Sequence, residues 1–160
     1  MKNTKQKPKE ILELEAIYQI QIEEKQIGVA ANNTYIVNAN GEVTKLDLAY
    51  NALKEIKGFE NFTSLDALDL SSCQLKEIKG LDNLVNLKTL NLCDNEITKI
   101  TGLDNLIKLD YLDLSGNPLK IKELEHLSNL TITNLTCHSD LIIPDEIYGY
   151  KSLAEILDNL

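Results

Sequence analysis

The sequence contains no arginine and no tryptophan, so its basic charge comes entirely from 16 lysines. Arginine is the usual bidentate reader of phosphate groups, and its absence argues against a nucleic-acid-binding protein. The 25 acidic residues leave a formal net charge of −9, which repels both nucleic acid and anionic lipid. We therefore expect neither nucleic acid nor a membrane among the partners of this protein.

Long apolar runs are also missing. No stretch approaches the roughly 20 apolar residues of a membrane span, and the first thirty residues lack the apolar core of a signal peptide. The three cysteines are odd in number and form no CxxC pair. We interpret them as reduced thiols in a cytoplasmic protein. Because a removed leader would leave the same sequence, export stays open as an alternative.

Catalytic and cofactor motifs are absent as well. The only histidines, His126 and His138, have no metal-ligand spacing, and the sequence contains neither GxxxxGK[ST] nor GxGxxG. No serine has a histidine aligned to activate it. We predict that the chain is not an enzyme and has no cofactor and no metal site.

What the sequence does contain is one pattern repeated four times. Residues 43–64, 65–86, 87–108 and 109–129 each carry an aliphatic residue at step 1, leucine at steps 4 and 6, and an aliphatic residue at step 11. A step is the position counted from the first residue of a repeat. The segment around steps 3–7 alternates like a short strand with steps 4 and 6 inward. Only a stack of such repeats can bury their aliphatic side.

Two other columns have conformational roles. Glycine occupies step 16 in the first three repeats, where the returning segment must bend. Step 9 is occupied mainly by asparagine, whose side chain can satisfy backbone groups in a buried turn. We interpret Cys73, at step 9 of the second repeat, as a substitute in this ladder. A weak fifth repeat would place His138 at the same step.

Two runs carry a family resemblance: LDALDLSSCQLKEIKGLDNLVN and LKTLNLCDNEITKITGLDNLIK. They resemble the 22-residue class of leucine-rich repeats, as in bacterial internalins and a eukaryotic protein phosphatase regulator. The likeness covers residues 43–129 closely, and 35–42 and 130–153 loosely. It implies an α/β solenoid, curved, with a concave parallel sheet, short 3₁₀ or extended convex segments, and a role in protein binding. The way the chain enters the array resembles some prokaryotic cytoplasmic members, which implies a prokaryotic source.

We expect one domain with three parts. Residues 1–34 would form a disordered basic start and an N-terminal helical cap. Residues 35–153 would form the array, with four clear repeats and one degenerate repeat. A β-hairpin with its turn at Asn40 and Gly41 would lead into the first repeat. Residues 154–160 would form a C-terminal capping helix.

The side chains on outward steps of the strands predict the binding surface. We expect a protein-binding concave face made of Lys45, Asp47, Tyr50, Asp66, Asp69, Asn91, Asp94, Asp110, Tyr111, Asp113, Ile132 and Asn134. Acids outnumber lysines on these steps, so the predicted partner is a protein with a basic patch. We predict a monomeric protein–protein interaction module. The alternative is a regulatory or substrate-docking domain of a larger enzyme.

One column of this face admits a second interpretation. Step 5 holds Asp47, Asp69 and Asp113 together with Asn91 and Asn134. Carboxylates on neighbouring strands, about 4.8 Å apart, could hold a cation such as Ca²⁺. The simpler interpretation is a solvated polar stripe that Asn91 interrupts.

Overall fold

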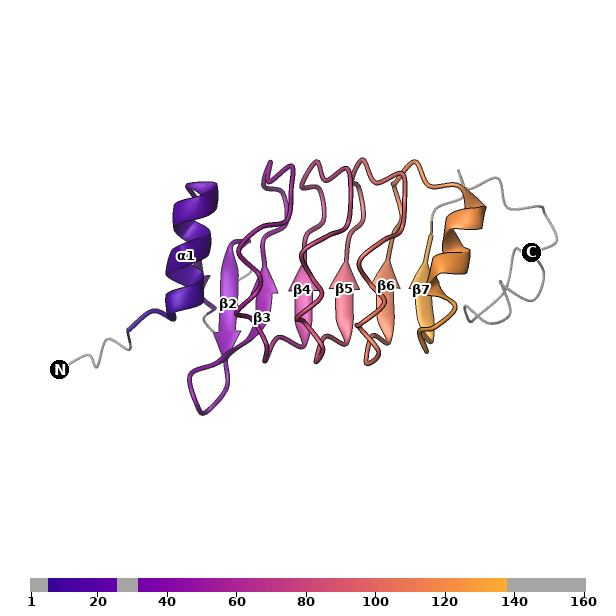
Figure 1. Cartoon of the computed structure of the whole chain (residues 1–160). Coiled ribbons are helices and arrows are strands. Elements are labelled where there is room, and N and C mark those ends of the chain that lie inside the picture. Colours follow the sequence, from indigo (N-terminus) through magenta and orange to yellow (C-terminus); the bar gives the residue numbers. More distant parts are fainter. Residues whose placement is uncertain (1–5, 26–31, 138–160) are drawn as a thin grey trace.

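The computed structural model describes residues 6–25 and 32–137. Their strands form a seven-stranded sheet in which spatial order follows chain order, from β1 to β7 (Figure 1). The elements are α1 (Lys9–Tyr18), β1 (Glu23–Glu24), β2 (Thr34–Val37), β3 (Val43–Asp47), β4 (Ala67–Asp69), β5 (Thr89–Asn91), β6 (Tyr111–Asp113), the 3₁₀ helix η1 (Ile121–Leu127) and β7 (Asn134–Thr136). Each strand from β4 onward follows one returning segment, so the predicted solenoid is confirmed.

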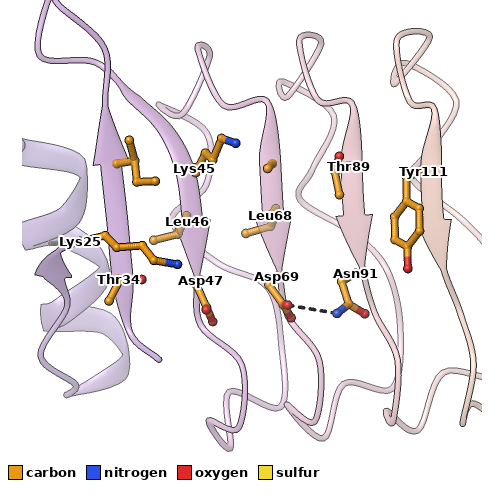
Figure 2. Close-up of a pocket in the computed structure, with 12 residues that line it drawn as sticks. Lys25, Thr34, Lys45, Leu46, Asp47, Leu68, Asp69, Thr89, Asn91 and Tyr111 are labelled. Atoms are coloured by element: carbon orange, nitrogen blue, oxygen red, sulfur yellow. Dashed lines mark hydrogen bonds between the residues drawn. The ribbon is translucent and has the colours of Figure 1, made fainter. Parts of the chain in front are cut away.

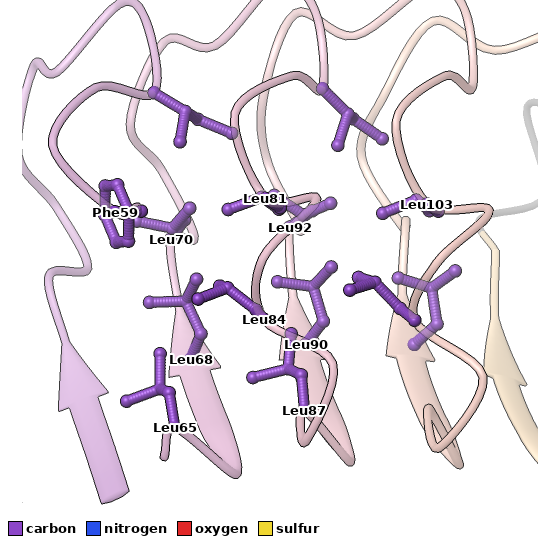
Figure 3. Close-up of a cluster of buried hydrophobic side chains, with 14 of the residues drawn as sticks. Phe59, Leu65, Leu68, Leu70, Leu81, Leu84, Leu87, Leu90, Leu92 and Leu103 are labelled. Carbon is purple, nitrogen blue, oxygen red and sulfur yellow. The ribbon is translucent and has the colours of Figure 1, made fainter. Parts of the chain in front are cut away.

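Columns of leucine hold the repeats together. The parallel strands pair with an offset of one repeat, which places Leu46, Leu68, Leu90 and Leu112 side by side at step 4. All four side chains are buried, and Figure 3 shows the stacked leucines of the central repeats. A single repeat would expose this apolar row, so each repeat is stabilised mainly by its neighbours.

The returning segments bend where glycine was predicted. At Gly102 the backbone φ is +70°, in the left-handed region that disfavours residues with a Cβ. A Cβ at this position would also lie 2.9 Å from the carbonyl oxygen of Ile78 in the preceding repeat. Step 16 therefore needs glycine both for its backbone conformation and for the close stacking of neighbouring repeats.

The step-9 ladder also forms, and Cys73 takes the predicted place in it. The Cys73 thiol donates a hydrogen bond to the carbonyl oxygen of Leu48 (3.2 Å), and the Cys73 amide donates to Oδ1 of Asn95 (3.0 Å). Asn95 and Asn117 are buried in the next two repeats. Since a buried backbone group without a partner is costly, these side chains make the tight turns compatible with burial.

The predicted hairpin leads into the first repeat. Strands β2 and β3 pair antiparallel, and the amide of Gly41 donates to the carbonyl oxygen of Asn38 across the turn (3.0 Å). Gly41 has a φ of +84°, as a tight turn of this kind requires. The short strand β1, which pairs parallel to β2, was not predicted. Two consecutive glutamates, Glu23 and Glu24, carry no apolar pattern that would indicate a strand.

Helix α1 lies beyond β2, at the N-terminal end of the stack (Figure 1). Its Ile11 and Leu14 side chains are buried in the same core cluster as the leucine columns. Near its end, the Tyr18 hydroxyl accepts a hydrogen bond from the amide of Lys57 (2.7 Å) and lies 3.0 Å from two carbonyl oxygens of the first repeat. The helix therefore packs on the first repeat, where an N-terminal cap is predicted.

The contribution of this anchor can be measured with Tyr18→Phe. Loss of the hydroxyl removes the acceptor of the Lys57 amide, so we expect the free energy of unfolding to fall by about 1 kcal/mol. Tyr50→Phe is the matched control, because the Tyr50 side chain is 73% exposed; its expected effect is within about 0.5 kcal/mol. Urea unfolding measures both variants, and equal losses would contradict an anchoring role for Tyr18.

The predicted register of the fifth repeat is wrong. It placed Ile132 at the outward step 3 and Asn134 at step 5, whereas the structure pairs Asn134 with Tyr111 at step 3. Ile132 therefore occupies step 1, points inward and is only 3% exposed. The step-1 residues Leu109 and Ile132 lie 23 positions apart, because the fourth repeat contains η1 and is one residue longer than the others rather than one shorter.

Part of the prediction falls beyond the described residues. The first five residues of the basic start, His138 and the capping segment 154–160 all lie outside them.

Candidate protein-binding face

The outward side of strands β2–β7, which we call the concave face, carries two rows of side chains. The step-3 row contains Lys45, Ala67, Thr89, Tyr111 and Asn134, and the step-5 row contains Asp47, Asp69, Asn91, Asp113 and Thr136. Figure 2 shows both rows on β3–β5 and Tyr111 on β6. Six of the predicted residues are thus brought together on β3–β6. Asn134 joins them in the step-3 row, while Ile132 belongs to the core.

The other predicted residues flank these rows. Asp66 and Asp110 precede β4 and β6 at step 2, and Asp110 accepts a hydrogen bond from the Thr133 hydroxyl. Tyr50 and Asp94 lie in the turns that follow β3 and β5, at step 8, and both have positive φ. Both side chains are exposed, in turns that adjoin the sheet.

The four Asp and Asn side chains at step 5 each have a structural task that the sequence analysis did not identify. In each, Oδ1 accepts a hydrogen bond from the amide two residues later, which forms an Asx turn at the end of the strand. The four bonds run from Ala49 to Asp47 (3.1 Å), from Ser71 to Asp69 (2.9 Å), from Cys93 to Asn91 (3.1 Å) and from Ser115 to Asp113 (2.9 Å). The regular Asp or Asn at step 5, followed by a small residue at step 7, was the available signal.

Asn91 links the row rather than merely interrupting it. Its Nδ2 donates a hydrogen bond to Oδ2 of Asp69 (3.0 Å; dashed line in Figure 2). Across residues 6–25 and 32–137, no three His, Cys, Asp or Glu side chains gather as a metal site would need. The hydrogen bonds that are present give the step-5 column a role in fixing its own turns.

Asp47 carries an electrostatic cost in the folded state. Partial burial raises the pKa of its carboxyl group; the amide of Ala49 opposes this shift, the charge of Asp69 adds to it, and the charge of Lys25 also opposes it. The folded-state pKa therefore lies above the unfolded value. The protonated carboxyl is the form that the fold favours, and stability is lost as the pH rises through the folded-state pKa.

The raised pKa of Asp47 predicts how Asp47→Asn changes the stability of the fold. The amide keeps the Oδ1 acceptor of the Asx turn, as Asn91 does naturally, but removes the charge. We expect the melting temperature at pH 7 to rise by about 1–2 °C, a small effect because solvent screens a partly exposed charge. At pH 3, where the carboxyl is protonated in both states, the variant and the wild type should melt together. A lower melting temperature at pH 7 would contradict the assigned cost.

A hollow opens between the two rows of the concave face and reaches from β2 to β6. Its volume is about 270 Å³. It is lined by Lys25, Thr34, Ile36, Lys45, Leu46, Asp47, Ala67, Leu68, Asp69, Thr89, Asn91 and Tyr111. Leu46 on β3 and Leu68 on β4 form its floor, below the short step-3 side chain of Ala67. Lys25 lies on the β2 side of the hollow and Tyr111 on the β6 side (Figure 2). Sequence reasoning identified five of these residues but not the cavity.

The cysteines are not activated nucleophiles. All three are free thiols. Burial raises the pKa of Cys73 to about 11 and that of Cys137 to about 12, and it also raises the pKa of Cys93. At neutral pH each is therefore protonated, and protonated thiols are weak nucleophiles. In the described part of the chain, no helix is both long enough and apolar enough to cross a bilayer.

Comparisons with known proteins agree with this architecture. A family profile described as Leucine Rich repeats (2 copies) matches residues 42–83 and 85–141. The search of curated proteins found no match. Among solved structures, an internalin C2 from Listeria monocytogenes is 31% identical with a TM-score of 0.58, over 66% of this chain and 49% of that one. An internalin (inlF) from the same species is 25% identical with a TM-score of 0.57, over 69% of this chain and 36% of that one.

The chain thus spans about half the length of the first of these internalins and about a third of the second. The profile covers most of the array, including the step-4 and step-6 leucines that form the core. The chain belongs to the leucine-rich repeat family.

Proposed function

We propose that this protein is a binding module whose acidic concave face takes a partner protein with a basic patch. Leucine-rich repeat proteins generally mediate protein–protein interactions, and internalin-like members are typically binding modules rather than enzymes. The observation that carries the proposal is the step-5 row, in which Asp47, Asp69 and Asp113 are each held by an Asx turn. Side chains fixed before binding lose little entropy when a partner arrives.

The size of the face limits how it can bind. Six strands at about 4.8 Å, each about 15 Å long, give roughly 400 Å², half of the ~800 Å² per partner in a typical stable complex. The contact must then extend onto the turns that carry Tyr50 and Asp94, or the binding is weak. The affinity should fall as salt rises, because exposed charges are screened over about 8–10 Å.

The proposed place of action is the cytoplasm, and the proposed state is a monomer. The three free thiols support this location, because reducing compartments keep cysteines unpaired.

The direct test neutralises two charges without disturbing the turns. Asp69→Asn with Asp113→Asn keeps both Oδ1 acceptors, whereas lysine at these positions would break the Asx turns. Because Asp69→Asn also removes the Oδ2 acceptor of Asn91, thermal melting must verify that the double variant folds like the wild type. We expect the double variant to bind a partner isolated by affinity capture about three- to tenfold more weakly at low salt. The difference should shrink at high salt.

The matched control is Asp82→Asn with Asp104→Asn, which changes the net charge equally. Both residues are exposed on returning segments, away from the strands. This control should bind the same partner as tightly as the wild type. If the two double variants lose affinity equally, only net charge matters and the concave face is not the binding site.

A further inference from the structure

We infer that the hollow on the concave face is the seat of one arginine side chain of the partner protein. The inference rests on the proposed function, because it names the residue that the acidic face would receive. Four features of the described residues carry it: the small area of the face, the shape of the hollow, the acceptors at one edge and the distribution of charge around it.

The small area of the face calls for a concentrated contact. A surface of about half the usual size can bind specifically if most of the energy comes from one buried anchor. Arginine, tyrosine and tryptophan are the residues most enriched at such anchors. The hollow, at about 270 Å³, lies just under the ~300–1,000 Å³ of small-molecule sites. It therefore suits one long side chain better than a cofactor.

The shape of the hollow fits a methylene stem that ends in a flat cation. Ala67 and Thr89 leave the space open beside Leu46 and Leu68, so the floor is largely apolar. Tyr111 lines the same hollow from β6, two strands beyond Leu68 (Figure 2). An aromatic ring attracts a cation over its face. A guanidinium can also stack on the ring because it is planar and weakly hydrated, which an ammonium is not. These properties favour arginine over lysine.

Asp69 supplies the acceptor at the end of the hollow. Its Oδ1 accepts hydrogen bonds from the amide and the hydroxyl of Ser71, and its Oδ2 accepts one from Asn91. A carboxylate offers about four acceptor sites, so these three bonds hold Asp69 in place and leave it able to accept from a ligand. The incoming group would meet a carboxylate that is already oriented.

The lysines around the hollow determine where the cation goes. Lys25 reaches across β2 toward Asp47 (Figure 2), and its charge already acts on that carboxyl. Lys45 lies on the same side, at step 3 of β3. Both lysines repel a cation from the β3 side, so the guanidinium would settle between Asp69 and Tyr111, on the β4–β6 side.

Amide chemical-shift titration of the full chain tests the inference with defined probes. N-acetyl-arginine methylamide is the ligand, and N-acetyl-citrulline methylamide is its neutral isostere. We expect saturable shifts at Ala67, Thr89 and Tyr111 with the arginine probe. The citrulline probe, and N-acetyl-lysine methylamide as the cationic comparison, should each bind about tenfold more weakly. Equal binding of citrulline, equal binding of lysine, or no saturable shift up to roughly 100 mM arginine probe would overturn the inference.

Two pairs of variants locate the site. Ala67→Met fills the hollow without changing charge and should weaken the arginine probe about tenfold, while Thr98→Met, in the exposed segment that returns from β5 to β6, should leave it unchanged. Tyr111→Leu should weaken binding of the arginine probe, whereas Tyr111→Phe should bind it like the wild type, because phenylalanine keeps the aromatic face. Thermal melting verifies that each variant folds. Unchanged binding by a folded Ala67→Met variant would overturn the inference.

Failure here is distinguishable from failure of the proposed function. Suppose that Asp69→Asn with Asp113→Asn weakens binding of the captured partner but the arginine probe causes no saturable shift at the hollow. The face then binds its partner without an arginine anchor. If that double variant behaves like its control, the acidic face itself is not the binding site.

Discussion

Replacing Leu90 by alanine is expected to lower the free energy of unfolding by about 2–5 kcal/mol. Leu90 is 0% exposed and stands between Leu68 and Leu112 in the step-4 column. Truncation removes buried apolar surface and leaves a cavity that two neighbouring repeats must close. Because a solenoid is stabilised by contacts between adjacent repeats, a defect in the central repeat weakens two interfaces at once.

Urea unfolding followed by circular dichroism measures this loss. Ile107→Ala is the matched control, since it removes an aliphatic side chain that is largely exposed; its effect should stay within about 0.5 kcal/mol. A comparably small loss for Leu90→Ala would mean that step 4 of the third repeat does not face the core.

The second large effect is expected from Asn95→Ala, which should lower the free energy of unfolding by about 3–5 kcal/mol. Asn95 is buried, and its side chain satisfies backbone groups of two adjacent repeats. Its Nδ2 donates to the carbonyl oxygens of Leu70, Leu92 and Cys93, and its Oδ1 accepts from the amides of Cys73 and Leu75. Alanine would leave these groups buried without partners, and each such group costs about 1–3 kcal/mol.

Asn95→Cys provides a graded comparison. Cys73 occupies the equivalent step and still donates to the carbonyl oxygen of Leu48, so cysteine should retain part of the stability that alanine loses. Asn105→Ala, at an exposed position, is the control and should change stability by no more than about 0.5 kcal/mol. If Asn95→Ala matched this control in urea unfolding, the ladder would not contribute to stability.

The repeat architecture could be predicted from the sequence because its signals are local and recur at a constant period. Leucine at steps 4 and 6 identifies an inward strand face wherever it occurs. Gly102 marks a bend through its own backbone, and Asn40 with Gly41 marks a tight turn in the same way. The place of Cys73 in the ladder followed from its step alone. Each of these inferences needed only neighbouring residue types and the constant repeat period.

The binding surface depended on the tertiary structure for its details. The step-5 aspartates were correctly placed on the outward face, but their Asx turns and the Asn91–Asp69 bond are three-dimensional contacts. The bond joins residues 22 positions apart, which only the pairing of β4 with β5 brings within reach. The hollow likewise exists because a small Ala67 and a large Tyr111 stand two strands apart in one row.

By itself, the sequence determined the fold family, the inward leucine columns, the bends and the acidic character of one face, since a fixed period places equal residues in equal environments. Only the tertiary structure decided the register of the last strand. The sequence alone does not show how many residues a returning segment contains. The fourth returning segment, which contains η1, is one residue longer than those of the preceding repeats. The fourth repeat was predicted to be one residue shorter than the others and is one residue longer, so the register of the last strand moves by two positions. Ile132, a predicted contact residue, therefore belongs to the core.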